Sequence, residues 1–263
     1  MRKVLVFAPL LMWFLQSNAQ VSSLFEEQLF IEGDDTLRCR ILTPQNFSTT
    51  KKFPLVVFLH GAGERGTDNE KQLTWGADLF LDSVNRAKYP AIVVFPQCPE
   101  NEAWSSVKRG QIKDTLGGFE FDTAAAQPKT AALVIRFIDS LVAKPGVDQN
   151  RVYLGGLSMG GFGTFEFLWR RPDLFAAAFP ICGGGVPAKV HSYAKKLPIW
   201  IFHGDADPIV PVTQSRRMVR ALQKTTAEIK YTEYPGVQHE SWKNAFAEPG
   251  LMEWIFSKKK PTR

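Results

Sequence analysis

Long apolar runs alternate with segments of helical periodicity along most of the chain. The runs 53–59, 91–95 and 198–202 contain almost no polar residue, as expected of strands that are buried on both faces of a sheet. Residues 129–143 instead repeat apolar side chains at helical spacing and stop before Pro145-Gly146. Because strands alternate with helices, we predict an α/β fold with a mostly parallel sheet and helices on both faces.

Shorter patterns complete this sheet. Segments 28–31 and 37–42 flank a Gly-Asp turn and predict an N-terminal antiparallel hairpin. Further strands are expected within 152–154, 173–181 and 229–234, and further helices within 68–86, 213–224 and 241–256. Residues 96–127 show no clear period, and an aperiodic segment of this length is more typical of a functional surface loop than of a simple connection. We therefore expect it to form one wall of a substrate site.

One of the predicted strands runs into a serine that is flanked by small residues. In Gly156-Leu157-Ser158-Met159-Gly160, glycines stand where side chains would collide with the neighbouring strand and helix of a tight turn. The five-residue pattern also arises by chance in glycine-rich loops. Here the apolar segment 152–154 precedes it and an apolar helix pattern follows, so we interpret it as a nucleophile elbow that presents the Ser158 hydroxyl.

A serine hydroxyl is a poor nucleophile at neutral pH unless a base accepts its proton, so Ser158 requires a histidine and that histidine requires an acid. Four histidines are present. His60 and His203 precede glycines at strand ends and are expected to shape loops, whereas His191 lies in a basic, polar segment. His239 follows the last predicted strand, which would let it swing over the elbow. We therefore assign the base to His239.

The acid is expected in the loop that follows the strand 198–202. Two carboxylates compete there, Asp205 and Asp207. Asp207 is favoured because Pro208 stiffens the loop directly after it, whereas Asp205 could cap the turn. The resulting order of serine, aspartate and histidine along the chain is that of one of the known catalytic triads.

A glycine-rich loop, His60-Gly61-Ala62-Gly63, follows the first buried strand. An oxyanion hole needs amide donors from two places. Met159 follows the nucleophile and would supply one N–H group, and Ala62 is the most plausible source of the other. The loop lacks the pattern of a phosphate-binding loop, so a nucleotide site is not expected.

Composition limits the class of protein. The 263 residues, 44% of them hydrophobic, can bury the core of one domain. The net charge of +6 is mild and dispersed, so it does not indicate a nucleic-acid partner. Cys39, Cys98 and Cys182 allow at most one disulfide and leave at least one thiol, and their spacing does not indicate a zinc site.

The first 19 residues have a pattern of their own. Arg2-Lys3 is a basic region, 4–15 is apolar, and Ser17-Asn18-Ala19 has the small residues of a signal-peptidase site. A membrane anchor is less favoured, because a spanning helix needs about 20 apolar residues. We expect a signal peptide cleaved near Ala19, a secreted or periplasmic location, and one catalytic domain over residues 20–263.

Together these motifs resemble the α/β-hydrolase superfamily across essentially all of the mature chain. The segment 59–66, the elbow and the two loops that carry Asp207 and His239 stand in the order of that superfamily. The chain looks like its secreted bacterial carboxylesterase, phospholipase and "predicted peptidase" branch, which is similar to feruloyl, acetylxylan and polyhydroxyalkanoate-depolymerase esterases. The resemblance implies a three-layer sandwich and ester cleavage through an acyl-enzyme on Ser158.

Two alternatives stay open: a peptidase that uses the same triad on small peptides, and a catalytically silent binding protein. Trp75, Trp104 and Trp242 could line a pocket for an aromatic group, with Trp104 and Trp242 as the candidate substrate-binding residues, although such residues more often pack in the core or in a wall. Glu64 and Arg65 are expected to form a structural ion pair. We expect a monomer that acts on a small-molecule or polysaccharide-linked ester without cofactor, metal or nucleic acid, and without stable membrane insertion.

Overall fold

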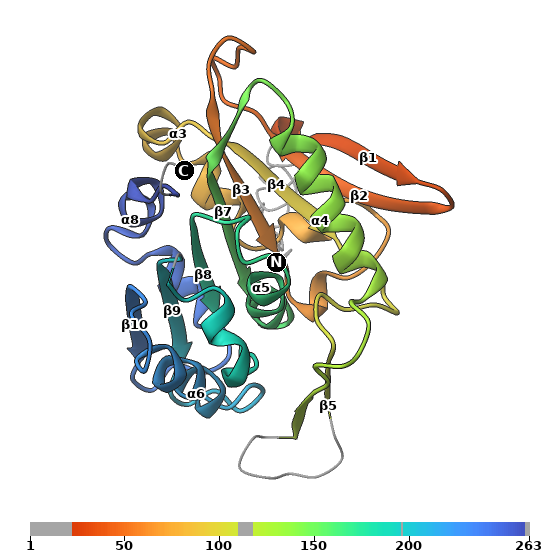
Figure 1. Ribbon diagram of the computed structural model, residues 1–263. Helices are drawn as coiled ribbons and strands as arrows, with labels where there is room; N and C mark the ends of the chain where they lie inside the picture. Colours follow the sequence, from red (N-terminus) through yellow and green to blue (C-terminus); the bar gives the residue numbers. More distant parts are fainter. Residues whose placement is uncertain (1–22, 110–117, 196, 261–263) are drawn as a thin grey trace, which may run out of the picture.

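Eight strands form one mixed sheet in the computed structural model, which describes residues 23–109, 118–195 and 197–260 (Figure 1). The strands are β1 (Glu26–Glu32), β2 (Asp35–Leu42), β3 (Phe53–Leu59), β4 (Ile92–Gln97), β7 (Val147–Leu157), β8 (Ala177–Ile181), β9 (Ile199–Gly204) and β10 (Ile229–Tyr234). Their spatial order is β1-β2-β4-β3-β7-β8-β9-β10. β2 pairs antiparallel with β1 and β4, and the pairs from β4 to β10 are parallel. The predicted sheet and its N-terminal hairpin are confirmed.

Helices cover both faces of this sheet because each central strand is apolar on both sides. In β3, Val57 belongs to a buried cluster that includes residues of α4 (Lys129–Val142), α5 (Met159–Arg170) and α6 (Thr213–Leu222). The neighbouring side chain Phe58 points the other way, into a cluster with residues of α2 (Ala77–Leu81), α7 (Trp242–Phe246) and α8 (Leu251–Ser257). The alternation of side chains along one strand thus produces two cores and three layers.

Two predicted helices are interrupted. Residues 68–86 do not form one helix: a short 3₁₀ turn η2 (Lys71–Leu73) is followed by α2 and by α3 (Ser83–Lys88). Gly76, with φ of 87°, separates η2 from α2, because this left-handed conformation cannot continue a helix. Residues 241–256 are likewise split into α7 and α8 at Pro249-Gly250, where the φ of Gly250 is 82°.

The segment 96–127 is not entirely irregular. Its short strands β5 (Val107–Arg109) and β6 (Phe119–Phe121) form a separate antiparallel pair. Phe119 stacks on Phe162 of α5 at 4.9 Å between ring centroids, and Phe121 lies 6.0 Å from the same ring. The segment therefore lies against the helix that follows the elbow.

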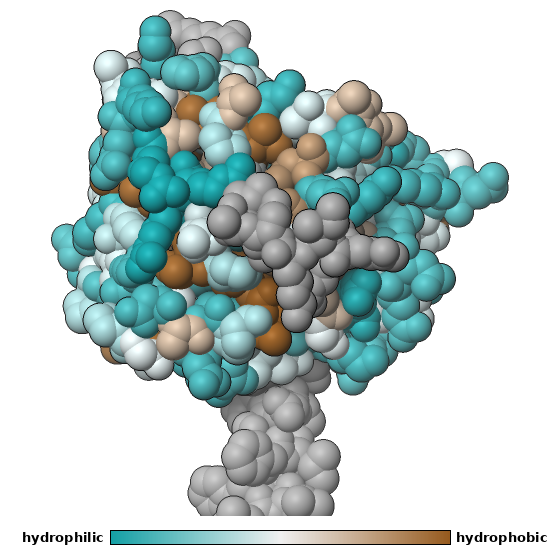
Figure 2. Space-filling model, turned by 90° about the horizontal axis from the view of Figure 1, so that it is seen from below, coloured by the Kyte–Doolittle hydropathy of each residue, from teal (hydrophilic) through white to brown (hydrophobic). Residues whose placement is uncertain are grey.

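The carboxyl ends of the parallel strands face the lower side of the molecule in Figure 1. Figure 2 looks at this side, where apolar surface gathers near the middle and hydrophilic residues surround it. In the part of the chain that the structure describes, no helix has the length and apolar character needed to cross a bilayer. The predicted signal peptide lies outside the described residues, which begin at residue 23.

Candidate active site

Ser158 lies at the sharp turn between β7 and α5. Its φ of 51° and ψ of −114° are rare for a residue with a side chain, and such strain persists only where the surrounding structure imposes it. The Ser158 N–H donates to the Ile181 carbonyl of β8 at 2.9 Å, which ties the turn to the sheet. Met159 is the first residue of α5, so its N–H group has no acceptor within the helix.

The two glycines of the elbow are required by the backbone around them. A Cβ on Gly160 would lie 1.9 Å from the Leu59 carbonyl oxygen, because α5 begins directly against the end of β3. A Cβ on Gly156 would lie 2.4 Å from the carbonyl oxygen of Gly160. Both contacts are to main-chain atoms, which cannot rotate out of the way. The tight turn thus depends on glycine at both positions.

The structure brings Ser158, His239 and Asp207 into one hydrogen-bonded row. The Ser158 Oγ is 2.9 Å from His239 Nε2, and His239 Nδ1 is 2.7 Å from Asp207 Oδ2. Because an ionised carboxylate can only accept, His239 Nδ1 carries the hydrogen of the second bond. Nε2 is then free to accept from the Ser158 hydroxyl, which is the tautomer that a general base needs.

Asp207 rather than Asp205 occupies the position behind the histidine. The Asp207 side chain is fully buried, and its Oδ1 accepts from the Ile209 and Val210 amides at 2.8 and 2.9 Å. Asp205 is exposed and accepts from the Gly236 amide at 2.6 Å, which ties the loop after β9 to the turn after β10. The two candidate acids therefore have different partners: Asp207 bonds to His239, and Asp205 bonds to the turn after β10.

His203 contributes to this carboxylate site in a way that the sequence did not indicate. It is the last but one residue of β9, and its Nε2 lies 2.9 Å from the Val210 carbonyl and 3.3 Å from Asp207 Oδ2. Burial by itself would raise the pKa of Asp207. The hydrogen bonds from His203, His239 and the Val210 amide outweigh burial and hold the pKa of Asp207 below its usual range.

The loop after β3 lies beside the nucleophile. A Cβ on Gly61 would be only 3.7 Å from the Ser158 Cβ, and the next residue, Ala62, is exposed at the start of the 3₁₀ turn η1 (Ala62–Glu64). His60 anchors this loop: the Cys98 N–H donates to its Nε2 at 3.0 Å, and its Nδ1 lies 2.6 Å from the Gly61 carbonyl. Since Nε2 accepts, His60 is a neutral histidine with its hydrogen on Nδ1.

The two tryptophans assigned to the substrate pocket have different surroundings. Trp104 is fully buried, its indole N–H donates to the His60 carbonyl at 2.9 Å, and a Cβ on Gly163 would meet its Cβ at 2.3 Å. A side chain packed between the loop and α5 cannot face a substrate, so that assignment is corrected. Trp242 lies next to the site, with its ring perpendicular to that of His239 at 5.4 Å.

Glu64 and Arg65 have different partners instead of forming the expected pair. The Arg65 guanidinium donates to the carbonyls of Ala62 at 3.1 Å and Glu100 at 3.0 Å. The Glu64 carboxylate faces the backbone N–H of Gly61 and the Trp75 side chain. The motif thus contributes a cation that braces the loop and a carboxylate that borders the site.

Cys182 is the remaining ionisable group near the row. Its sulfur, a carboxylate oxygen of Asp207 and a ring nitrogen of His239 lie within 4.8 Å of one another. Burial and the Asp207 charge raise the pKa of the Cys182 thiol well above its usual range, so the thiol stays protonated and is a poor metal ligand. All three cysteines are buried and free, so none of the described sulfurs forms the disulfide that the sequence allowed.

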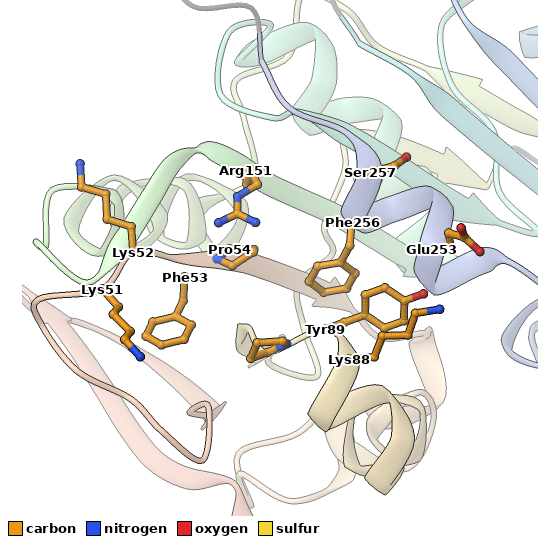
Figure 3. A pocket seen from close by; sticks show the side chains of 11 residues that line it. Lys51, Lys52, Phe53, Pro54, Lys88, Tyr89, Arg151, Glu253, Phe256 and Ser257 are labelled. Atoms are coloured by element: carbon orange, nitrogen blue, oxygen red, sulfur yellow. The ribbon is translucent and has the colours of Figure 1, made fainter.

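A different hollow lies at the opposite ends of the strands (Figure 3). This groove of ≈ 700 Å³ is lined by Phe53 and Pro54 at the start of β3, by Lys88, and by Phe256 of α8. Ser158, His239 and Asp207 do not line it. The hydrogen-bonded row therefore belongs to the carboxyl-end face and not to this groove.

The chain is similar to known esterases and dipeptidyl peptidases. A crystal structure of a thermostable esterase matches 91% of this chain and 64% of its own, with 36% identity and a TM-score of 0.80. A poly(3-hydroxyalkanoate) depolymerase C from Paucimonas lemoignei is 33% identical over 135 residues, which are 50% of this chain and 28% of the depolymerase. A probable dipeptidyl-peptidase 5 from Aspergillus niger is 24% identical over 250 residues, which are 83% of this chain.

The chain spans about a third of that dipeptidyl peptidase, 33% of its length. The chain matches the phospholipase/carboxylesterase family from residue 47 to residue 248. This range includes the elbow, the loop after β3 and the loops that carry Asp207 and His239. The chain belongs to the phospholipase/carboxylesterase family of α/β hydrolases.

Proposed function

We propose that the protein is a serine esterase that cleaves carboxylic esters through an acyl-enzyme intermediate. The observation that carries this proposal is the 2.9 Å contact between Ser158 Oγ and His239 Nε2, with Asp207 bonded to the other ring nitrogen. Family membership makes the chain a hydrolase, and this row is what a serine nucleophile requires.

The proposed reaction has two half-reactions. Ser158 Oγ attacks the ester carbonyl carbon while its proton passes to His239 Nε2, which gives a tetrahedral oxyanion. When that intermediate collapses, the alcohol leaves with the proton from His239 and the acyl group stays on Ser158. A water molecule then attacks the acyl-enzyme with His239 as base, and the carboxylic acid leaves as Ser158 recovers its proton. Asp207 keeps the ring oriented and stabilises the imidazolium in both halves.

The oxyanion is proposed to bind the N–H groups of Met159 and Ala62. Met159 begins α5, where the positive end of the helix dipole favours negative charge. Ala62 follows the glycine that approaches Ser158 most closely along the loop after β3. Removal of one such donor commonly costs 10²- to 10³-fold in kcat.

Substrate and location are further parts of the proposal. We propose that the mature protein is exported and acts on small-molecule or polysaccharide-linked esters, including aryl esters of the feruloyl type. The matched depolymerase is named for a polyester substrate, which supports ester chemistry in this group of relatives. Trp242, which contacts the catalytic ring, is proposed to border the bound ester.

A peptidase is the second candidate, because two dipeptidyl peptidases match 83% and 81% of this chain. The same row of side chains could attack an amide. Matched ester and amide substrates with one acyl group decide between the two: hydrolysis of the amide without the ester would favour the peptidase.

The test uses residues 20–263 and the variant Ser158→Ala. Both proteins are incubated with a fluorophosphonate probe and with short-chain, long-chain and feruloyl-type esters. We expect labelling and turnover of the parent protein, and loss of both in the variant, with kcat reduced by roughly 10⁴-fold or more. A folded parent protein that neither labels nor turns over any ester or amide would instead indicate a binding protein.

A further inference from the structure

One carboxylate at the site has no part in the proposed reaction. The Oε2 atom of Glu64 lies 3.0 Å from the position that a Cβ on Gly61 would take, and the Ser158 Cβ lies 3.7 Å from the same position. The Glu64 carboxylate and the Ser158 side chain therefore both lie close to Gly61. The Glu64 side chain is half-buried, so it is partly open to the space above the loop.

A chain of aromatic contacts places Glu64 on the side of the leaving alcohol. His239 returns its proton to the leaving oxygen, so the alcohol part of an ester lies on the His239 side of the nucleophile. Trp242 packs on His239 at 5.4 Å, and Trp75 packs on Trp242 at 5.7 Å. The Trp75 side chain in turn faces the Glu64 carboxylate.

The cations near Glu64 are bonded elsewhere. Arg65 donates to the carbonyls of Ala62 and Glu100, and Lys243, whose Nζ lies 5.2 Å from the Trp75 ring centroid, pairs with Glu240 at 2.5 Å. Burial raises the pKa of Glu64, and hydrogen bonds from the Gly61 amide, its own amide and the Trp75 side chain oppose this effect without cancelling it. A partly desolvated carboxylate in this position is stabilised when a ligand brings a hydrogen-bond donor or a positive charge to it.

We propose that Glu64 is a specificity-determining residue: its carboxylate accepts a hydrogen bond from a hydroxyl group, or attracts the positive charge of an ammonium group, on the alcohol part of the substrate. It also disfavours alcohols that carry a carboxylate there. The inference rests on the proposed esterase function, which defines the side of the leaving group.

The experiment uses acetate esters of four alcohols of similar size. Glycerol carries hydroxyls, choline carries a cation, glycolate carries a carboxylate, and 3,3-dimethylbutanol is the neutral isostere of choline. kcat/KM for each ester is measured with the parent protein, Glu64→Gln and Glu64→Leu. Glu70→Gln is the matched control, because Glu70 is an exposed carboxylate on the same connection after β3.

The expected result is a change in ratios. In Glu64→Gln the ratio of kcat/KM for the choline ester to that for its isostere falls about tenfold. The value of kcat/KM for the glycolate ester rises by a similar factor. The glycerol ester keeps its advantage over the neutral ester, because the amide oxygen still accepts, and loses it only in Glu64→Leu. Glycerol and choline esters thus separate hydroxyl from ammonium recognition. Ratios that are the same in the parent protein and both variants would overturn the inference.

A binding measurement makes the inference independent of turnover. The variant Ser158→Ala, with and without Glu64→Gln, is titrated with the choline ester and its isostere, and tryptophan fluorescence reports binding. We expect the preference for the cation to depend on Glu64. If no ester is cleaved but this preference is present, the proposed function fails while the assignment of Glu64 stands. Equal binding of both esters to both variants overturns the assignment.

Discussion

The Asp207 carboxylate lies 2.7 Å from His239 Nδ1 and is fully shielded from solvent, although the two residues are 32 positions apart in the sequence. Asp205, only two positions before Asp207, is exposed and bonds to the backbone of Gly236 instead. Chemically identical groups on one loop therefore have separate partners: one orients the His239 ring, and the other holds the loop.

The variant Asp207→Asn tests this division. An asparagine amide at this position can donate to His239 and stabilise the wrong tautomer, so we expect kcat to fall roughly 10⁴-fold with KM little changed. The measurement is steady-state kinetics on the best ester. Asp205→Asn is the matched control and should leave kcat nearly unchanged; equal losses in both variants would contradict the assignment.

The glycine at position 160 is expected to be irreplaceable. In Gly160→Ala the new methyl group would meet the Leu59 carbonyl oxygen, so α5 must move away from β3 and the elbow must open. We expect a loss of about 1–3 kcal/mol in the free energy of unfolding and a large loss of kcat. Urea denaturation and ester kinetics measure the two effects.

Gly63→Ala provides the comparison for that variant. No atom lies within 4 Å of a Cβ at Gly63, so this substitution should change the free energy of unfolding by less than about 0.5 kcal/mol. If Gly160→Ala behaved like Gly63→Ala, the close approach of α5 to β3 would be wrong.

His60 should make the stability depend on pH between about 4 and 6.5. Burial lowers the pKa of His60 to about 4 in the folded protein, whereas a histidine in an unfolded chain titrates near 6.5. Between these values the unfolded state binds the extra proton, so stability is complete above pH 6.5 and is lost as the pH falls towards 4. The loss reaches about 3 kcal/mol.

Urea denaturation at several pH values between 4 and 7 measures this effect. The variant His60→Gln is expected to be less stable than the parent protein at pH 7, but its free energy of unfolding should change less steeply with pH. His191→Gln, at an exposed position, should keep the slope of the parent. The lowered pKa of Asp207 acts in a different range, because its contribution is present above about pH 4 and lost below it. An unchanged slope in His60→Gln would contradict the buried neutral state.

Trp104 is expected to matter for stability rather than for binding. Trp104→Phe removes the donor to the buried His60 carbonyl, and we expect a loss of about 1–3 kcal/mol in the free energy of unfolding. KM for aryl and alkyl esters should stay unchanged. Trp242→Phe, which alters the ring next to His239, should change KM instead. A selective loss of aryl-ester binding in Trp104→Phe would restore the original assignment.

Much of the site could be predicted because its chemistry is local. The elbow needs glycine two positions before and after Ser158, and this requirement is visible in five consecutive residues. The central strands could be located because burial on both faces demands apolar runs, and β3 and β10 begin and end where the pattern predicts. The helix expected to end near Arg86 and the helix expected within 241–256 are each divided into shorter pieces, because a periodic pattern does not show where a glycine adopts positive φ.

The roles of Trp104 and His203 depend on contacts with residues that are distant in the sequence. Trp104 could not be distinguished from a pocket residue until its indole was found on the His60 carbonyl, 44 positions away in the sequence. His203 looked like a loop residue, yet its ring approaches Asp207. The structure also shows that Arg65 braces carbonyls while Glu64 borders the site.

The sequence by itself determined the α/β architecture, the family, the identity of the candidate nucleophile and base, and two candidates for the acid. These features depend on side-chain periodicity and on short backbone requirements, which neighbouring residues encode. Only the tertiary structure placed Asp207 rather than Asp205 against His239, moved Trp104 into the core and brought Glu64 beside the nucleophile. These outcomes depend on how loops from separate strands pack at one edge of the sheet, and no local pattern contains that information.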